Sequence, residues 1–208
     1  MQTVAVLGVV VAGGRGTRLG TATPKYQVRF GGTTLLQRAV RNLEQVADQV
    51  IVVTPRERRP ARVPKGSRWV RDSPLGEGPL AGVVGGLRAA PYRDAVVLGV
   101  DFPLLDPEFL RALIEMRRHL GVGAVVPCEV STPQPLLAAY APRAADLLEA
   151  ALRSGERSVI EAVRTLEPFF LSAMNIANLS GGLDNLVNVN TPENLAAARR
   201  RYAELARQ

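Results

Sequence analysis

Apolar, β-branched runs alternate along the chain with segments of helical periodicity. The first run, Val4–Val11, reads VAVLGVVV and stops at a glycine-rich segment, which is the pattern of a central strand in a parallel sheet. Further buried strands are expected at residues 49–53, 67–70, 95–100 and 123–126. Helices are expected at residues 35–46, 80–90, 107–120 and 143–152. This alternation predicts an α/β fold with a mostly parallel, Rossmann-like sheet and helices on both of its faces.

A final helix is expected to begin at residue 192 and to run to the end of the chain. Thr191 is a typical N-cap, Pro192 suits the first helical position, and Glu193 complements the helix dipole in the first turn. The sequence shows no linker-like tract, and 208 residues with 47% hydrophobic side chains can bury a sizeable core. Residues 1–208 are therefore expected to form a single domain.

Candidate chemistry first appears after the first predicted strand. Parallel sheets of this type bind ligands at the carboxyl ends of their strands, and residues 12–20, which read AGGRGTRLG, lead from there to Lys25. Glycines let backbone N–H groups approach phosphate oxygens, while Arg18 and Lys25 supply positive charge. The segment fits neither the dinucleotide fingerprint, whose last glycine is replaced by Leu19, nor the P-loop. An anion site and a plain strand-to-helix turn both remain open.

The formal net charge of +7 suggests an anionic ligand, but most of this charge comes from arginine. Only two of the 26 basic residues are lysines, Lys25 and Lys65. Lys25 follows the glycine-rich segment, where a compact ammonium can neutralise a phosphate. The arginine-rich stretch at residues 56–71 raises the alternative of a nucleic-acid-binding module. Trp69 is its one base-stacking ring and Glu57 interrupts its charge, so this alternative is the weaker one.

Two aspartates follow later predicted strands. Asp101 comes directly after the strand at residues 95–100, and a carboxylate there suits Mg²⁺, which takes one or two carboxylates together with substrate phosphates. The alternative role of Asp101 is to cap the next helix, for which Asp106 is better placed. Asp72 opens a turn-rich loop, where contact with a nucleoside and ordinary turn chemistry are both open.

The apolar start of the chain is interpreted as a strand and not as a signal or membrane segment. Residues 3–12 lack a preceding basic segment and are shorter than the roughly 20 residues of a spanning helix. Cys128 is the single cysteine, so it has no partner for an intramolecular disulfide, and no histidine cluster accompanies it. These features predict a cytoplasmic protein that does not contact a membrane.

Five motifs, in order along nearly the whole chain, resemble those of the molybdenum cofactor guanylyltransferases. They are residues 11–20 with Lys25, residues 78–82 (GPLAG), Asp101-x-Pro103, residues 155–158 (GERS) and residues 187–193 (VNVNTPE). The first motif is shared by many nucleotidyltransferases, whereas GPLAG and NTPE are more specific. The resemblance implies a nucleotide-diphospho-sugar transferase-like fold. It also implies Mg²⁺-dependent transfer of GMP from GTP to the terminal phosphate of molybdopterin that carries molybdenum, with release of pyrophosphate.

The resemblance implies roles for individual residues as well. Those expected to contact the guanine nucleotide and to enclose its phosphates are Val11, Ala12, Gly13, Gly14, Gly16 and Arg18. The remaining expected site residues are Lys25 for phosphate, Asp72 for the nucleoside, Asp101 for Mg²⁺, and Asn188 and Asn190 for the pterin side. The expected catalytic groups are therefore Arg18, Lys25 and Asp101.

The choice of nucleotide and acceptor keeps an alternative. Relatives with Ala-Gly-Gly in the first motif tend to use GTP and those with Ala-Ala-Gly tend to use CTP, so Gly13 and Gly14 favour guanine. Residues 24–27 (PKYQ) are closer to cytidylyltransferases of isoprenoid synthesis and to sugar-nucleotide enzymes. A nucleotidyltransferase that uses CTP or a sugar-phosphate acceptor is therefore the alternative. The expected partners are GTP and the molybdopterin cofactor, with molybdoenzymes or other cofactor-biosynthesis proteins as further candidates.

Overall fold

The structure is a computed structural model that describes residues 3–14, 16–20, 23–57, 60 and 62–207, and the side chain of Arg18 lies outside this description. Its strands are β1 (Val4–Val11), β2 (Arg29–Phe30), β3 (Thr33–Thr34), β4 (Gln49–Thr54), β5 (Ser67–Arg71), β6 (Tyr92–Gly99), β7 (Ala124–Glu129), β8 (Thr132–Pro133), β9 (Leu137–Tyr140) and β10 (Phe169–Leu171). Its α-helices are α1 (Leu35–Glu44), α2 (Pro79–Leu87), α3 (Pro107–Leu120), α4 (Ala144–Arg153), α5 (Val159–Arg164), α6 (Ala173–Ala177) and α7 (Pro192–Leu205). Its 3-10 helices are η1 (Thr17–Leu19), η2 (Lys25–Gln27) and η3 (Gly182–Leu186).

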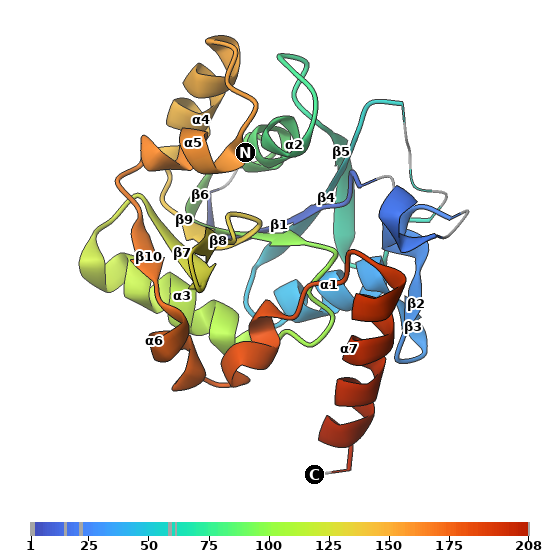
Figure 1. Cartoon of the computed structure of the whole chain (residues 1–208). Coiled ribbons are helices and arrows are strands. Elements are labelled where there is room, and N and C mark those ends of the chain that lie inside the picture. Colours follow the sequence, from blue (N-terminus) through green and yellow to red (C-terminus); the bar gives the residue numbers. More distant parts are fainter. Residues whose placement is uncertain (1–2, 15, 21–22, 58–59, 61, 208) are drawn as a thin grey trace.

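A central sheet organises the described part of the chain (Figure 1). Its strands lie in the order β10-β7-β9-β6-β1-β4-β5, and β8 pairs with β7. Strand β1 pairs in parallel with β4 on one side and with β6 on the other, so that Val11 lies opposite both Val53 and Gly99. The antiparallel strand β9 lies between β6 and β7. The predicted mostly parallel α/β sheet is confirmed.

The strands and helices expected from periodicity are present, with ends that differ by a few residues. Several short elements were not predicted, and these are β2, β3, β8, β9, β10, α5 and α6. Strand β9 shows the reason: its four residues, LAAY, are all buried, so they carry no alternation of apolar and polar positions. Elements this short are formed by packing against their neighbours and leave little periodic signal.

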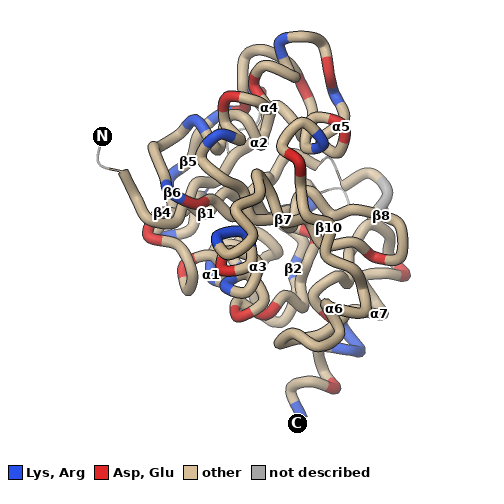
Figure 2. The backbone as a smooth tube through the Cα atoms, turned by 90° about the vertical axis from the view of Figure 1, so that its left-hand side faces the viewer, with Lys and Arg blue, Asp and Glu red and all other residues tan. Residues whose placement is uncertain are grey.

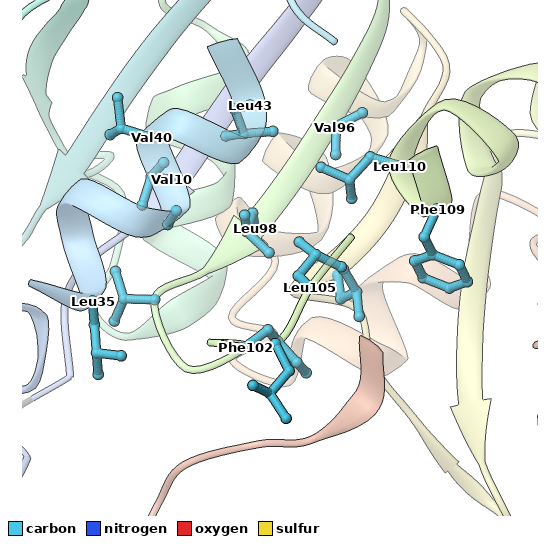
Figure 3. Close-up of a cluster of buried hydrophobic side chains, with 14 of the residues drawn as sticks. Val10, Leu35, Val40, Leu43, Val96, Leu98, Phe102, Leu105, Phe109 and Leu110 are labelled. Carbon is cyan, nitrogen blue, oxygen red and sulfur yellow. The ribbon is translucent and has the colours of Figure 1, made fainter. Parts of the chain in front are cut away.

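Helices cover both faces of the sheet, as expected. Along β1, Val6 and Val10 pack into a core shared with α1 and α3, whereas Leu7, Val9 and Val11 pack into a second core shared with α2 and α4. This alternation follows from the two-residue period of a strand. Figure 3 shows part of the first core, where side chains of the sheet lie between those of α1 and α3.

Glycines on α2 bring this helix unusually close to the central strand. A Cβ atom on Gly86 would lie 2.2 Å from Val9 Cγ1, and one on Gly82 would lie 3.0 Å from Val11 Cγ1. Only glycine leaves room for this approach. The start of α2 is thereby held beside the carboxyl end of β1, where ligands bind in sheets of this type.

The starts of α3 and α7 are fixed by helix caps. Asp106 is the N-cap of α3 and accepts a hydrogen bond from Glu108 N, so Asp101 is not needed for that purpose. Thr191 and Asn194 form a reciprocal capping box at the start of α7, with Pro192 at the first helical position. The predictions for both helix starts are confirmed.

The charge is spread over the molecule. In Figure 2, Lys and Arg positions lie on many elements with Asp and Glu positions among them. This distribution agrees with an arginine-rich composition more than with one large basic face. Within the residues that the structure describes, no helix has the length and apolar character needed to cross a membrane.

Candidate active site

A pocket of about 280 Å³ opens at the carboxyl ends of β1, β4 and β6. Several chain segments that are distant in sequence meet there because these three strands are neighbours and run in parallel. The lining residues are Val11, Gly13, Gly14, Lys25, Val53, Thr54, Pro55, Asp72, Gly78, Pro79, Gly82, Gly99, Val100, Asp101 and Leu136. The pocket therefore contains the glycine-rich segment, the rare lysine and both candidate aspartates.

Lys25 and Asp101 form an ion pair in this pocket. Lys25 Nζ lies 3.0 Å from Asp101 Oδ2, and their side chains are only 10% and 19% exposed. Lys25 Nζ also donates a hydrogen bond of 2.6 Å to Asn190 Oδ1. Because a carboxylate and an amide oxygen hold the ammonium, its position in the pocket is fixed before any ligand arrives.

The glycine-rich segment packs directly against the backbone of Lys25. Gly16 has a φ of 67°, in the left-handed region, and a Cβ atom there would lie 2.9 Å from Lys25 N. A side chain at this position would be strained and would also displace the lysine. The glycine therefore lets the first loop and η2 lie together at the pocket.

The carboxylate of Asp101 depends on a second close approach. A Cβ atom on Gly99, the last residue of β6, would lie 2.3 Å from Asp101 Oδ1. The backbone of Asp101 is held as well, because its carbonyl oxygen accepts a hydrogen bond of 2.9 Å from Val189 N. The backbone of Asp101 is thus held by a neighbouring segment, and its carboxylate has room because residue 99 has no side chain.

Asp72 lines the pocket and has one carboxylate oxygen without a hydrogen-bond partner among the described residues. Its Oδ1 atom is buried and has no hydrogen-bond partner within the described residues, and Arg56 Nε lies 4.0 Å away. Burial raises the pKa of Asp72 above its ordinary value, repulsion from Glu57 adds to this effect, and Arg56 opposes it. A buried acceptor without a partner is costly, so this atom is suited to receive a hydrogen bond from a ligand.

The predicted site residues fall into three groups. Those that line the pocket are Val11, Gly13, Gly14, Lys25, Asp72 and Asp101. Ala12 lies beneath the pocket, where it is buried and donates its N–H to Val53 O. Gly16 packs against Lys25, Asn190 hydrogen-bonds to Lys25, and Asn188 hydrogen-bonds to Asn190. The side chain of Arg18, on η1, lies outside the described residues.

Several lining residues were not among the predicted site residues. Val53, Thr54 and Pro55 follow the same rule as the first loop, since they stand at the carboxyl end of β4. Their position after a predicted strand could have identified them. Leu136 has no such signal, because it precedes β9, whose antiparallel course is not visible in the sequence pattern.

The donors in the pocket fit a hard cation of the kind that nucleotide chemistry uses. The described residues contain no cluster of three or more His, Cys, Asp or Glu side chains that could enclose a metal. Mg²⁺ needs no such cluster, because it is commonly held by one or two carboxylates, substrate phosphates and water. Asp101 and Asp72 supply carboxylates to the same pocket.

Several residues of the stretch considered for nucleic-acid binding make contacts within the protein. Trp69 Nε1 donates to Thr54 Oγ1 over 2.9 Å, and the Arg71 guanidinium lies 5.7 Å from the centre of the Trp69 ring. Arg68 donates to the carbonyl oxygen of Ala89. Arg58 and Arg59 lie outside the described residues. The one aromatic ring of the stretch is therefore packed against its own neighbours.

The parallel sheet, its glycine-rich first loop and the pocket with paired lysine and aspartate define the class of the protein as an α/β nucleotidyltransferase. Comparison with known proteins gives the family. Residues 8–167 match the MobA-like NTP transferase domain, and the chain belongs to this family.

Named relatives agree with the family. The chain is 34% identical over 186 residues to the molybdenum cofactor guanylyltransferase of Pseudomonas syringae, covering 88% of each chain. Among solved structures it is similar to molybdopterin-guanine dinucleotide biosynthesis protein A from Archaeoglobus fulgidus, with 26% identity, a TM-score of 0.79 and coverage of 95% of this chain and 99% of that one. The resemblance inferred from the motifs is confirmed.

The same fold occurs in an enzyme of the alternative type. The 2-C-methyl-D-erythritol 4-phosphate cytidylyltransferase from Thermus thermophilus has a TM-score of 0.68, with coverage of 96% of this chain and 98% of that one, at 18% identity. At this identity the likeness concerns the fold alone. It confirms the expected nucleotide-diphospho-sugar transferase-like architecture and carries no information on the substrate.

Proposed function

We propose that the chain, acting as one nucleotidyltransferase domain, transfers GMP from GTP to the terminal phosphate of molybdopterin that carries molybdenum. An oxygen of the acceptor phosphate forms a bond to the α-phosphorus of GTP. The bond between the α-phosphorus and the bridging oxygen breaks, and pyrophosphate leaves with the electron pair. The observation that carries the proposal is one pocket that combines a fixed lysine–aspartate pair with an unsatisfied buried carboxylate.

The residues of the pocket suit this step without a strong general base. The acceptor phosphate is already an anion near neutral pH, so catalysis rests on in-line positioning and on neutralisation of charge. Lys25 faces the pocket and places one positive charge there, while Gly13 and Gly14 let backbone approach the phosphates. We assign Arg18 to the leaving pyrophosphate from its place in the first motif.

Asp101 is the residue we propose to hold Mg²⁺. When bound, the ion supplies charge stabilisation and orients the phosphates for displacement. The carboxylate of Asp101 is set for this by Gly99 beneath it and by Val189 N on its backbone. Asp101 also holds Lys25, so the metal ligand and the phosphate-binding cation are positioned by the same hydrogen bond.

Asp72 is the residue we propose to select the nucleoside. A carboxylate accepts hydrogen bonds and donates none when ionised. Guanine offers two neighbouring donors, N1–H and its exocyclic amine, whereas cytosine offers only an exocyclic amine beside acceptors. The carboxylate of Asp72, whose buried Oδ1 has no hydrogen-bond partner among the described residues, therefore favours GTP over CTP.

The second candidate function is transfer from CTP or to a sugar phosphate, which the sequence of residues 24–27 favours. Thermal unfolding with GTP, CTP and UTP, each with and without Mg²⁺, separates the candidates. A nucleotide at about 100 times its Kd stabilises the folded state by about 2.7 kcal/mol. The proposal expects the largest increase in Tm with GTP and Mg²⁺ together.

Location and partners complete the proposal. Cys128 is free and partly buried, which suits the reduced cytoplasm where we place the protein. The proposed small-molecule partners are GTP and the molybdopterin cofactor. The dinucleotide product is consumed by apoproteins that need it, which makes molybdoenzymes and cofactor-biosynthesis proteins the partners to test.

A further inference from the structure

Lys25 stands at one end of a chain of side-chain hydrogen bonds that leads away from the pocket. Its Nζ atom donates to Asn190 Oδ1 over 2.6 Å, and Asn190 Nδ2 donates in turn to Asn188 Oδ1 over 2.7 Å. Neither asparagine is among the described residues that line the pocket. The hydrogen bonds of Asn188 and Asn190 thus join the two side chains to Lys25.

Backbone contacts fix the segment that carries the two asparagines. Val189 N donates to Asp101 O over 2.9 Å, and the Val189 side chain is completely buried in the first core. Val189 is turned into the core, whereas Asn190 reaches Lys25 and hydrogen-bonds to Asn188.

The two ends of an amide group are chemically different, and Asn188 decides which end faces the lysine. The carbonyl oxygen of Asn190 accepts a hydrogen bond, whereas its NH₂ group would repel an ammonium. Because Asn190 Nδ2 donates a hydrogen bond to Asn188 Oδ1, the carbonyl end of Asn190 is held toward Lys25. A neutral acceptor also holds the ammonium without cancelling its charge, as a second carboxylate beside Asp101 would do.

We propose that Asn188 and Asn190 are positioning residues that act through Lys25. This inference rests on the proposed function, in which Lys25 neutralises phosphate. Asn190 places the ammonium, and Asn188 orients Asn190. Both would then affect the rate of transfer more than the binding of the acceptor.

The lysine content of the chain allows Lys25 to be observed directly. Lys25 and Lys65 are its only two lysines, so ¹⁵Nζ-lysine labelling in a Lys65→Arg background gives one side-chain resonance. We expect a protected ammonium signal in the Lys65→Arg protein and in Asn188→Asp, which keeps an oxygen acceptor for Asn190. The signal is lost to exchange in Asn188→Ala and Asn190→Ala. Asn178→Ala removes an exposed asparagine that bonds to Met174 O and is the matched control.

Steady-state kinetics give the second measurement. For Asn188→Ala and Asn190→Ala the proposal predicts a fall in kcat of about tenfold, with the acceptor KM within about twofold of the parent value. Asn188→Asp retains more kcat than Asn188→Ala. A direct pterin contact predicts the reverse order, because a carboxylate at position 188 would repel the anionic acceptor.

The outcomes separate this proposal from the proposed function. An acceptor KM that rises about tenfold at unchanged kcat in the alanine variants, with the Lys25 signal intact, overturns the positioning role. If the parent protein transfers no GMP, the proposed function fails, but the Lys25 signal in the four variants still decides whether the asparagines hold the lysine. A Lys25 ammonium signal that is equal in all variants contradicts the positioning role of the asparagines.

Discussion

Lys25 Nζ donates a hydrogen bond of 3.0 Å to Asp101 Oδ2 although the two residues are 76 positions apart in the sequence. The contact joins the segment that follows β1 with the loop that follows β6. These strands are adjacent and parallel, so their carboxyl ends meet at one edge of the sheet. The pair places a cation and a carboxylate at the point where a nucleoside triphosphate and its Mg²⁺ would need them.

Substitution of Asp101 is expected to remove activity without removing the fold. Asp101→Asn keeps the size of the side chain and an oxygen for Lys25, but it loses the charge that a divalent cation requires. We expect GMP transfer to fall by about a thousandfold, with an unchanged far-UV circular dichroism spectrum. GMP transfer within a few-fold of the parent rate by a folded Asp101→Asn protein would contradict the assignment.

Lys25→Ala is expected to slow the chemical step by about a hundredfold or more, because the neutralising charge at the phosphates is lost. Single-turnover kinetics with preformed enzyme and GTP measure this step directly. Lys65→Ala, at the other lysine of the chain, is the matched control. Lys25→Arg is not expected to restore the rate, because a planar guanidinium does not reproduce the two contacts of a compact ammonium.

Gly99→Ala tests whether the position of the Asp101 carboxylate matters. The new Cβ atom would lie 2.3 Å from Asp101 Oδ1, so the carboxylate must turn away. Displacement of the Asp101 carboxylate is expected to lower kcat by about a hundredfold. Because the atom displaced is the end of a side chain, we expect the Tm to change little. A parent-like kcat would show that the carboxylate needs no fixed position.

The affinity for GTP is expected to depend on the ionisation of Asp72. Burial, with repulsion from Glu57, raises the pKa of Asp72 above 3.8. The carboxyl therefore takes up a proton, and GTP binding weakens, at a higher pH than for an ordinary aspartate. Calorimetric titration with GTP over a range of acidic pH measures this step.

Two substitutions test the origin of that pH dependence. Asp72→Asn is expected to weaken GTP binding by about 10- to 100-fold near neutral pH and to abolish the step, since a hydrogen bond to a charged group is worth about 1.5–3 kcal/mol. Glu57→Gln removes a negative charge that raises the pKa, so the step moves to lower pH. A pH profile that is identical in the parent and Asp72→Asn would exclude Asp72 from nucleotide binding.

The sequence predicted the parts of the site that follow the rule for parallel sheets. The sequence identifies Gly13 and Asp101 because they stand after predicted strands and Lys25 because it is a rare lysine after the glycine-rich segment, and the structure brings all three to one pocket. Leu136 could not be predicted, because an antiparallel strand places it there. The bond between Lys25 and Asn190 spans 165 positions, and no local pattern reports such a distance.

The fold was predictable to a similar extent and for the same reason. Long buried strands such as β1 and β6 carry an unmistakable apolar run, and amphipathic helices such as α1 and α3 carry a regular period. Strand β10 has three residues, of which only Leu171 is buried. Its pairing with β7 is set by tertiary packing, which the sequence pattern does not contain.

Guanylyl transfer by this protein can be measured in one incubation. The protein is mixed with Mg²⁺, molybdopterin that carries molybdenum, and either GTP or CTP, and the dinucleotide and pyrophosphate are quantified. We expect guanine dinucleotide and pyrophosphate in equal amounts with GTP, and a much slower reaction with CTP. A cytosine dinucleotide as the main product, or no nucleotide transfer from GTP, would contradict it.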